Sequence, residues 1–121
     1  INTIAPLRVA NAFLPNVQAA KGKIITLSSQ MGATGASSDS LAYRVSKQAV
    51  NRLMRALATD LKPQGIPVLI VHPGWVKTEM GGEGAQLTPE ESAAQLLKLI
   101  DKFEIASTGR FLAWNGKELA W

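Results

Sequence analysis

The stretch Lys23-Ile24-Ile25-Thr26-Leu27 is a short, nearly continuous run of apolar and branched residues. It is too short for a helix, and branched side chains favour extended backbone, so we predict a buried strand. Residues 66–71 (IPVLIV) repeat this character, and Pro67 is acceptable there because it stands at the beginning of the run. A third, shorter strand is predicted at residues 109–114 (GRFLAW).

Segments with the periodicity of a helix lie before the first predicted strand and between the following strands. Over residues 4–20 the apolar side chains recur at spacings of three and four, which predicts a helix. Pro15 is expected to kink or interrupt this helix near its end, and Gly22 is expected to stop it. Thr88-Pro89-Glu90-Glu91 has the cap, the proline and the returning glutamate of a helix start, and that helix is predicted to run to about Asp101.

The longest predicted helix begins near Asp39 or Ser40, either of which can cap it, and runs to about residue 61. Pro63 and Gly65 are expected to end it. Its side chains are apolar over most of its circumference, which indicates burial on two sides. We expect one side to cover the sheet and the other to be available to a second subunit.

In chain order the elements alternate helix, strand, helix, strand, helix, strand, which is the pattern of a parallel α/β sheet with crossover helices. The loop over residues 32–40 is rich in small residues, and the loop over residues 80–87 is rich in glycine and expected to be mobile. Ser28 and Ser29 follow the first strand directly, at the edge where open α/β sheets bind ligands. The length of 121 residues corresponds to one domain or part of one.

The composition limits the classes of function. The 13 basic residues exceed the 9 acidic ones, but they are scattered and not interleaved with aromatic residues, so no motif indicates nucleic-acid binding. The absence of cysteine excludes disulfides and thiolate metal sites and is compatible with a cytoplasmic protein. No apolar run approaches the ~20 residues of a membrane helix. Because the chain opens on Ile1 without a secretory leader, we expect that it is cut at its N-terminus.

Tyr43 and Lys47 stand four positions apart in the longest predicted helix, which places them on the same face. A free tyrosine is a poor acid or base at neutral pH, but a neighbouring ammonium group favours its phenolate form. The pair is therefore suited to moving a proton to or from an oxygen. On its own, the spacing is also typical of a surface helix with a solvated lysine and a half-buried tyrosine.

Four short elements occur in a fixed order: Asn2, Ser28-Ser29, Tyr43-x-x-x-Lys47 and Pro73-Gly74-x-Val76-x-Thr78. With these elements, and over essentially all its residues, the chain closely resembles the C-terminal half of a short-chain dehydrogenase/reductase. Residues 72–78 (HPGWVKT) and 87–92 (LTPEES) are most similar to the C-factor (C-signal) branch of that family. The resemblance implies the last three strands of a Rossmann-type doubly wound fold, with residues 1–121 as the C-terminal part of one NAD(P)-binding domain.

The resemblance also implies roles for the polar residues of these elements. Tyr43 would be the acid/base that protonates a carbonyl oxygen or deprotonates an alcohol, and Lys47 would assist it and hydrogen-bond the nicotinamide ribose. Ser29 would hold the substrate oxygen beside Tyr43, whereas a serine pair can also simply end a strand. Asn2 would anchor a water that leads protons to Lys47.

The residues after the second strand would shape the ligand site. The resemblance implies that Pro73, Gly74, Val76 and Thr78 form the nicotinamide pocket. Trp75 and Met80 are then candidates for substrate contact, although Trp75 is equally suited to packing and residues 80–87 are either a substrate lid or an inert loop. His72 is interpreted as structural, because no partner cluster indicates a ligand or a base. No metal site is predicted.

The family's first half, with the Thr-Gly-x-x-x-Gly-x-Gly turn that binds the pyrophosphate, does not occur in this sequence. NAD and NADP therefore cannot be distinguished, and one edge of the sheet is expected to be uncovered. The expected partners are a small carbonyl or alcohol substrate, further copies in a dimer or tetramer, and the missing N-terminal half, with no nucleic acid or membrane. Two alternatives are a non-enzymatic signalling or interaction fragment of C-factor type and a plain α/β binding module.

Overall fold

A computed structural model describes residues 1–33 and 39–121. The helices and strands are, in chain order, α1 (Ile4–Ala19), β1 (Ile24–Leu27), α2 (Leu41–Leu61), β2 (Val68–His72), α3 (Pro89–Lys102) and β3 (Phe111–Ala113). A 3-10 turn, η1 (Gln30–Gly32), follows β1, and two more lie at Lys62–Gln64 and Ile105–Ser107. Most of the small-residue loop predicted at 32–40 falls on residues 34–38, outside the described residues.

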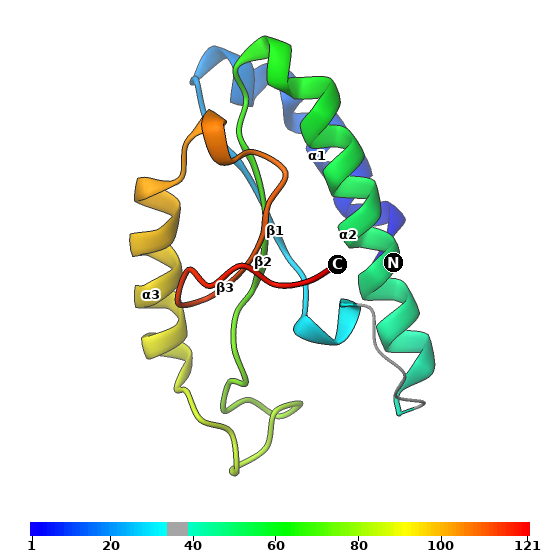
Figure 1. The fold of residues 1–121 in the computed structure, drawn as a ribbon, viewed down its shortest axis with the longest axis vertical. Coiled ribbons are helices and arrows are strands. Elements are labelled where there is room, and N and C mark those ends of the chain that lie inside the picture. The colour runs from blue at the N-terminus through cyan, green and yellow to red at the C-terminus, as the bar shows by residue number, and fades with distance from the viewer. Residues whose placement is uncertain (34–38) are drawn as a thin grey trace.

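The three strands form one parallel sheet in the order β1-β2-β3. Leu27 pairs with Val71, and His72 pairs with Ala113, so the strands end close together at one edge. Figure 1 shows α1 and α2 on one side of the sheet and α3 on the other. The predicted α/β class and the parallel arrangement are confirmed.

Alternation along the buried strands divides the core into two layers. Val68 and Ile70 of β2 belong to the cluster under α1 and α2, whereas Leu69 and Val71 belong to the cluster under α3. All five residues of β2 are buried, as a central strand covered on both faces requires. The remaining side chains of the first cluster include Val50, Met54, Leu57 and Phe111.

The strand boundaries differ from the predicted ones for reasons visible in the hydrogen bonds. The predicted second strand began at Ile66, but Ile66 N–H donates to Leu61 O at the end of α2, and Pro67 has no N–H, so β2 begins at Val68. The third strand begins at Phe111 and not at 109, because the N–H of Arg110 is directed to Ser107 O in the preceding turn.

The helix ends test the predicted start and stop signals. Helix α1 continues through Pro15 to Ala19, so the predicted interruption is wrong, and only one N–H is lost there. The predicted cap by Ser40 is also wrong, because Ser40 has a φ of 52° and its side chain makes no cap hydrogen bond. The predicted start of α3 is confirmed, since Thr88 and Glu91 form a reciprocal capping box.

The two helices on the same side of the sheet keep apolar side chains at the surface. Helix α2 covers the sheet with one side, as predicted, but Leu41 and Val45 on its first turns are 63% and 55% exposed. Helix α1 likewise exposes Val9 and Phe13. In the described ranges, every helix falls short of the length and apolarity that crossing a membrane requires.

Candidate active site

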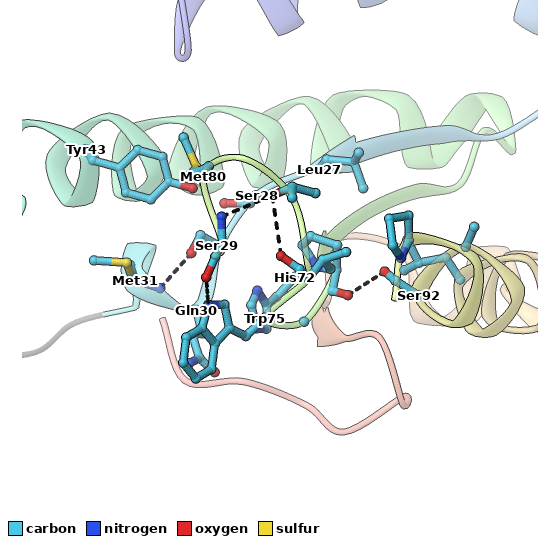
Figure 2. A pocket seen from close by; sticks show the side chains of 18 residues that line it. Leu27, Ser28, Ser29, Gln30, Met31, Tyr43, His72, Trp75, Met80 and Ser92 are labelled. Atoms are coloured by element: carbon cyan, nitrogen blue, oxygen red, sulfur yellow. Dashed lines mark hydrogen bonds between the residues drawn. The ribbon is translucent and has the colours of Figure 1, made fainter. Parts of the chain in front are cut away.

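A cavity of about 660 Å³ opens at the edge of the sheet where the strands end. Its walls come from the end of β1, from η1, from the first turn of α2, from the loop after β2 and from the first turns of α3. Eight of the predicted site residues line it, namely Ser29, Tyr43, Pro73, Gly74, Trp75, Val76, Thr78 and Met80. In Figure 2, Tyr43 extends from α2 toward the segment that carries Ser28 and Ser29.

Ser29 is held in position by the turn that it begins. Its Oγ accepts a hydrogen bond of 3.1 Å from the backbone N–H of Met31, and Gly32 N–H donates to the Ser29 carbonyl at 2.8 Å. A hydroxyl that accepts one hydrogen bond still has its own hydrogen to donate. The Ser29 side chain is therefore a buried donor fixed at the wall of the cavity.

Tyr43 and Lys47 lie one turn apart on α2, as their spacing predicts. The Lys47 Nζ atom is 5.7 Å from the centre of the Tyr43 ring and donates to Leu27 O at 3.3 Å. Partial burial lowers the pKa of Lys47, because desolvation disfavours its charged form. Lys47 does not line the main cavity; it lines a second hollow instead.

The second hollow, of about 410 Å³, lies between α1 and the edge of β1. Asn2 and Lys47 both line it, so these two predicted residues border a different hollow from the one that Ser29 lines. The Asn2 amide donates to Ser46 Oγ at 3.4 Å, and Thr3 Oγ1 donates to Ser46 O at 3.1 Å. Asn2 is thus linked to α2 through Ser46, and its role toward a water remains a prediction.

The segment after β2 forms a closely packed wall. Gly74 has a φ of 93°, and a Cβ there would collide with Leu87 Cδ1 and lie 2.9 Å from Trp114 Cδ1. Only glycine fits such a position without displacing its neighbours. The absence of a side chain at 74 therefore lets this loop pack against Leu87 and Trp114, and Gly74 itself lines the cavity.

Hydrogen bonds connect the glycine-rich loop to itself. The Trp75 indole N–H donates to Gly81 O at 2.8 Å, and Gly81 N–H donates to Thr78 Oγ1 at 3.1 Å. Lys77 N–H donates to Leu87 O at 2.8 Å, which closes the base of the loop. Trp75 remains half exposed at the rim of the cavity, so both of its predicted roles, packing and substrate contact, stay open to it.

Three buried polar residues, His72, Ser92 and Asn51, lie at the cavity or behind its wall and were not predicted from the sequence to belong to the site. His72, interpreted as structural, lines the cavity at the end of β2; its Nδ1 has no hydrogen-bond partner among the described residues, and burial lowers its pKa. Ser92 of α3 donates to Pro73 O at 2.6 Å. Asn51 of α2 accepts from the Ser28 hydroxyl. The sequence carries no signal for Asn51, because its partners Ser28 and Gly32 lie 23 and 19 positions away.

The polar groups at the cavity are mainly hydroxyl groups, with Lys47 nearby. Within residues 1–33 and 39–121, the side chains of His, Asp and Glu form no group of three that could hold a metal ion. The arrangement offers hydroxyl donors, one ammonium group and a glycine-lined wall. It can therefore bind an oxygen atom of a small molecule and exchange a proton with it.

Comparison with known proteins gives a consistent result. The model of the family described as "Enoyl-(Acyl carrier protein) reductase" matches residues 1–119. C-signal of Myxococcus xanthus is 40% identical over 100% of this chain and 75% of its own length. The 1-hydroxy-2-glutathionyl-2-methyl-3-butene dehydrogenase of Rhodococcus sp. is 38% identical over all of this chain and 56% of its own length.

Solved structures share the arrangement as well. The carbonyl reductase Sniffer of D. melanogaster superposes with a TM-score of 0.92 at 38% identity, over 99% of this chain and 54% of that one. The NADPH-bound carbonyl reductase from chicken fatty liver gives 0.91 at 38% identity, with the same coverage. The chain thus spans three quarters of C-signal and about half of these other relatives.

Proposed function

The chain belongs to the short-chain dehydrogenase/reductase family, and on that premise we propose that the full-length protein transfers hydride between NAD or NADP and a small carbonyl compound or the corresponding alcohol. One observation carries the proposal. Ser29 from the end of β1 and Tyr43 from α2 line the same cavity, although 14 positions separate them. The wall from Pro73 to Thr78 borders that cavity.

In this proposal Tyr43 is the acid/base. During reduction its hydroxyl gives a proton to the carbonyl oxygen of the substrate, while the Ser29 hydroxyl donates a hydrogen bond to the same oxygen. During oxidation of the alcohol the proton moves in the opposite direction. The ammonium group of Lys47, 5.7 Å from the Tyr43 ring centre, stabilises the phenolate that remains after proton donation.

The residues present fit one end of a nicotinamide cofactor. Pro73, Gly74, Val76 and Thr78 would hold the nicotinamide, because all four line the cavity that Tyr43 and Ser29 also line, and packing against Leu87 and Trp114 fixes the backbone at Gly74. Tyr43 and Lys47 would hold the adjoining ribose. When bound, the cofactor supplies or accepts the hydride, which no side chain of this chain can do. Four of the similar solved structures are described as bound to NADPH or NADP, which supports this cofactor class.

The substrate side of the cavity is largely apolar. Met31, Trp75, Met80 and Leu96 line it, so the proposed substrate carries an apolar group next to its carbonyl. The phosphate-binding turn of the family does not occur in this chain, so we propose that an N-terminal half supplies it and pairs with β1, whose outer edge has no partner strand in the described part of the chain.

The experiment uses the full-length protein with NADPH or NADH and a panel of small ketones and aldehydes. Tyr43→Phe removes only the hydroxyl, and we expect kcat to fall by about 10²-fold or more because the proton donor is lost. Cofactor binding, followed by quenching of the reduced-cofactor fluorescence, should persist in the variant. Unchanged turnover in Tyr43→Phe would show that Tyr43 is not the acid/base.

A non-enzymatic interaction role is the second candidate. Leu27 at the edge of β1 is 57% exposed, and Ile4 and Val9 of α1 expose apolar surface to a similar extent. Exposed apolar side chains at an open strand edge favour contact with another chain. We also propose that the apolar surfaces of α1 and α2 pair two copies of the protein. A biological activity that survives Tyr43→Phe would favour the interaction role.

A further inference from the structure

Asn51 is the one fully buried side chain of α2 that carries an amide, with 1% of its surface exposed. Its neighbours on the buried face of the helix are apolar, Val50 and Met54 among them. A buried amide costs stability unless both its oxygen and its nitrogen find partners. Packing alone would favour an apolar residue at position 51, because it carries no polar group that must find a partner. The hydrogen-bond partners of Asn51 therefore indicate what the amide does.

Both partners of Asn51 belong to the segment that contains Ser29. The Ser28 hydroxyl donates to Asn51 Oδ1, and Asn51 Nδ2 donates to Gly32 O at 3.4 Å. A backbone carbonyl can only accept, so the NH₂ group must face Gly32 and the amide oxygen must face Ser28. The two hydrogen bonds enclose Ser29 and the turn η1 between them.

The same segment is anchored to the sheet and touches α2 directly. Ser28 N–H donates to Val71 O at 2.7 Å, which extends the pairing of β1 with β2 by one residue. A Cβ on Gly32 would lie 2.8 Å from the backbone carbonyl carbon of Lys47, so the turn rests against the helix backbone. Ser29 thus stands on a segment held by β2 on one side and by α2 on the other.

We propose that Asn51 is a positioning residue that holds the Ser29 turn against the helix carrying Tyr43, and so sets the relation between the two hydroxyl groups. It lies eight residues, or about 12 Å, along α2 from Tyr43, so it acts through the turn and not on the substrate. The inference rests on the proposed function, because it assigns Asn51 a purpose through Ser29.

The first test needs no substrate. In the full-length protein, Asn51→Ala should speed hydrogen exchange at the amides of Met31, Gly32 and Ala33 by about 10-fold or more, because local opening of the turn becomes easier. The control is Met54→Ala, a truncation of a fully buried residue of the same helix that lines neither hollow. Ser28→Ala, which removes a single hydroxyl, should act in the same direction if Asn51→Ala folds poorly.

The second test is a kinetic cycle with Ser29. Asn51→Ala should lower kcat by about 10- to 100-fold in the wild-type background, since displacement of a reacting group by ~1 Å has effects of that size. In the Ser29→Ala background the same change should lower kcat by less than about 3-fold, because the group being positioned is already absent. Met54→Ala should leave kcat within about 2-fold where the protein is folded.

Two results would overturn the proposal. One is exchange in the turn that is no faster in Asn51→Ala and Ser28→Ala than in Met54→Ala. The other is an equal loss of kcat in the presence and absence of the Ser29 hydroxyl, which would make Asn51 merely structural. Failure of the proposed function can be told apart from failure of the inference about Asn51. Full activity in Tyr43→Phe would contradict the role of Tyr43 as acid/base. The hydrogen-exchange experiment would still show whether Asn51 holds the turn.

Discussion

Gly32→Ala probes the contact between the Ser29 turn and the helix that carries the Tyr43–Lys47 pair. An added Cβ would lie 2.8 Å from the Lys47 carbonyl carbon, 2.9 Å from Lys47 Cβ and 3.0 Å from Gln48 N. Two of the three atoms belong to the helix backbone, which cannot rotate away as the end of a flexible side chain can. The strain must therefore be relieved by moving the turn.

The size of the effect follows from these distances. Carbon atoms approach favourably at about 3.5 Å, so a contact at 2.8 Å requires a retreat of about 0.7 Å. Overpacking of this kind costs about 1–3 kcal/mol. Loss of the glycine's freedom in the unfolded chain offsets about 0.4–1 kcal/mol, which leaves a net destabilisation between about 0 and 2.6 kcal/mol, with a central value of about 1.3 kcal/mol. A shift approaching 1 Å at Ser29 should lower kcat by about 10- to 100-fold.

The assay combines urea unfolding with steady-state reduction of a carbonyl substrate by the full-length protein. The matched control is Gly22→Ala, because a Cβ there would have its nearest contact at 3.5 Å, an ordinary van der Waals distance. That control should be neutral or slightly stabilising and should keep its kcat. If Gly32→Ala matches Gly22→Ala in both stability and kcat, the turn is not pressed against the helix and the reasoning about Ser29 is wrong.

Two further predictions concern stability. Burial lowers the pKa of His72 in the folded protein, so the unfolded chain binds a proton there more readily. The contribution of neutral His72 to the free energy of unfolding is therefore complete above the ordinary histidine pKa. It is lost as the pH falls toward the lower pKa of the folded protein. His72→Leu should therefore reduce the loss of unfolding free energy between pH 7.5 and about pH 5 in urea titrations, and an unchanged pH dependence would contradict this. Thr88→Ala removes half of the capping box of α3 and should lower the unfolding free energy by about 1 kcal/mol, whereas Thr59→Ala on the exposed side of α2 should change it by less than about 0.5 kcal/mol.

Most of the fold could be predicted from local patterns, because the strands are continuous apolar runs and the helices have strong periodicity. The boundaries could not, since they depend on which carbonyl each N–H reaches. Ile66 has the side chain of a strand residue, but its N–H donates to Leu61 O. Ser40 is a residue type that often caps helices, but its backbone is in the left-handed region. Both outcomes are set by the chain on either side of the residue, which local propensity does not describe.

Part of the candidate site could be predicted from the sequence, because the topology of a parallel sheet brings the ends of its strands together. Ser29 was expected at the crevice because parallel strands end at one edge of the sheet, Tyr43 was expected beside it from the family resemblance, and both line the cavity there. Asn51 escaped notice because a single polar residue in a helix is ordinarily exposed, and its partners Ser28 and Gly32 lie 23 and 19 positions away. Long-range pairing of this kind leaves no periodic trace in the sequence.

The two hollows meet at Leu27, which lines both and whose carbonyl accepts from Lys47 Nζ. The position of Ser29 relative to the helix that carries Tyr43 is fixed by residues of this chain, namely by the turn after β1 and by the hydrogen bonds of Asn51. The Lys47 side is open along the outer edge of β1, which has no partner strand in the described part of the chain. A segment that pairs with that edge would border the hollow that Lys47 lines. In the proposed function, this chain therefore sets the positions of the two hydroxyl groups, and a segment adjoining β1 would complete the surroundings of the ammonium group of Lys47.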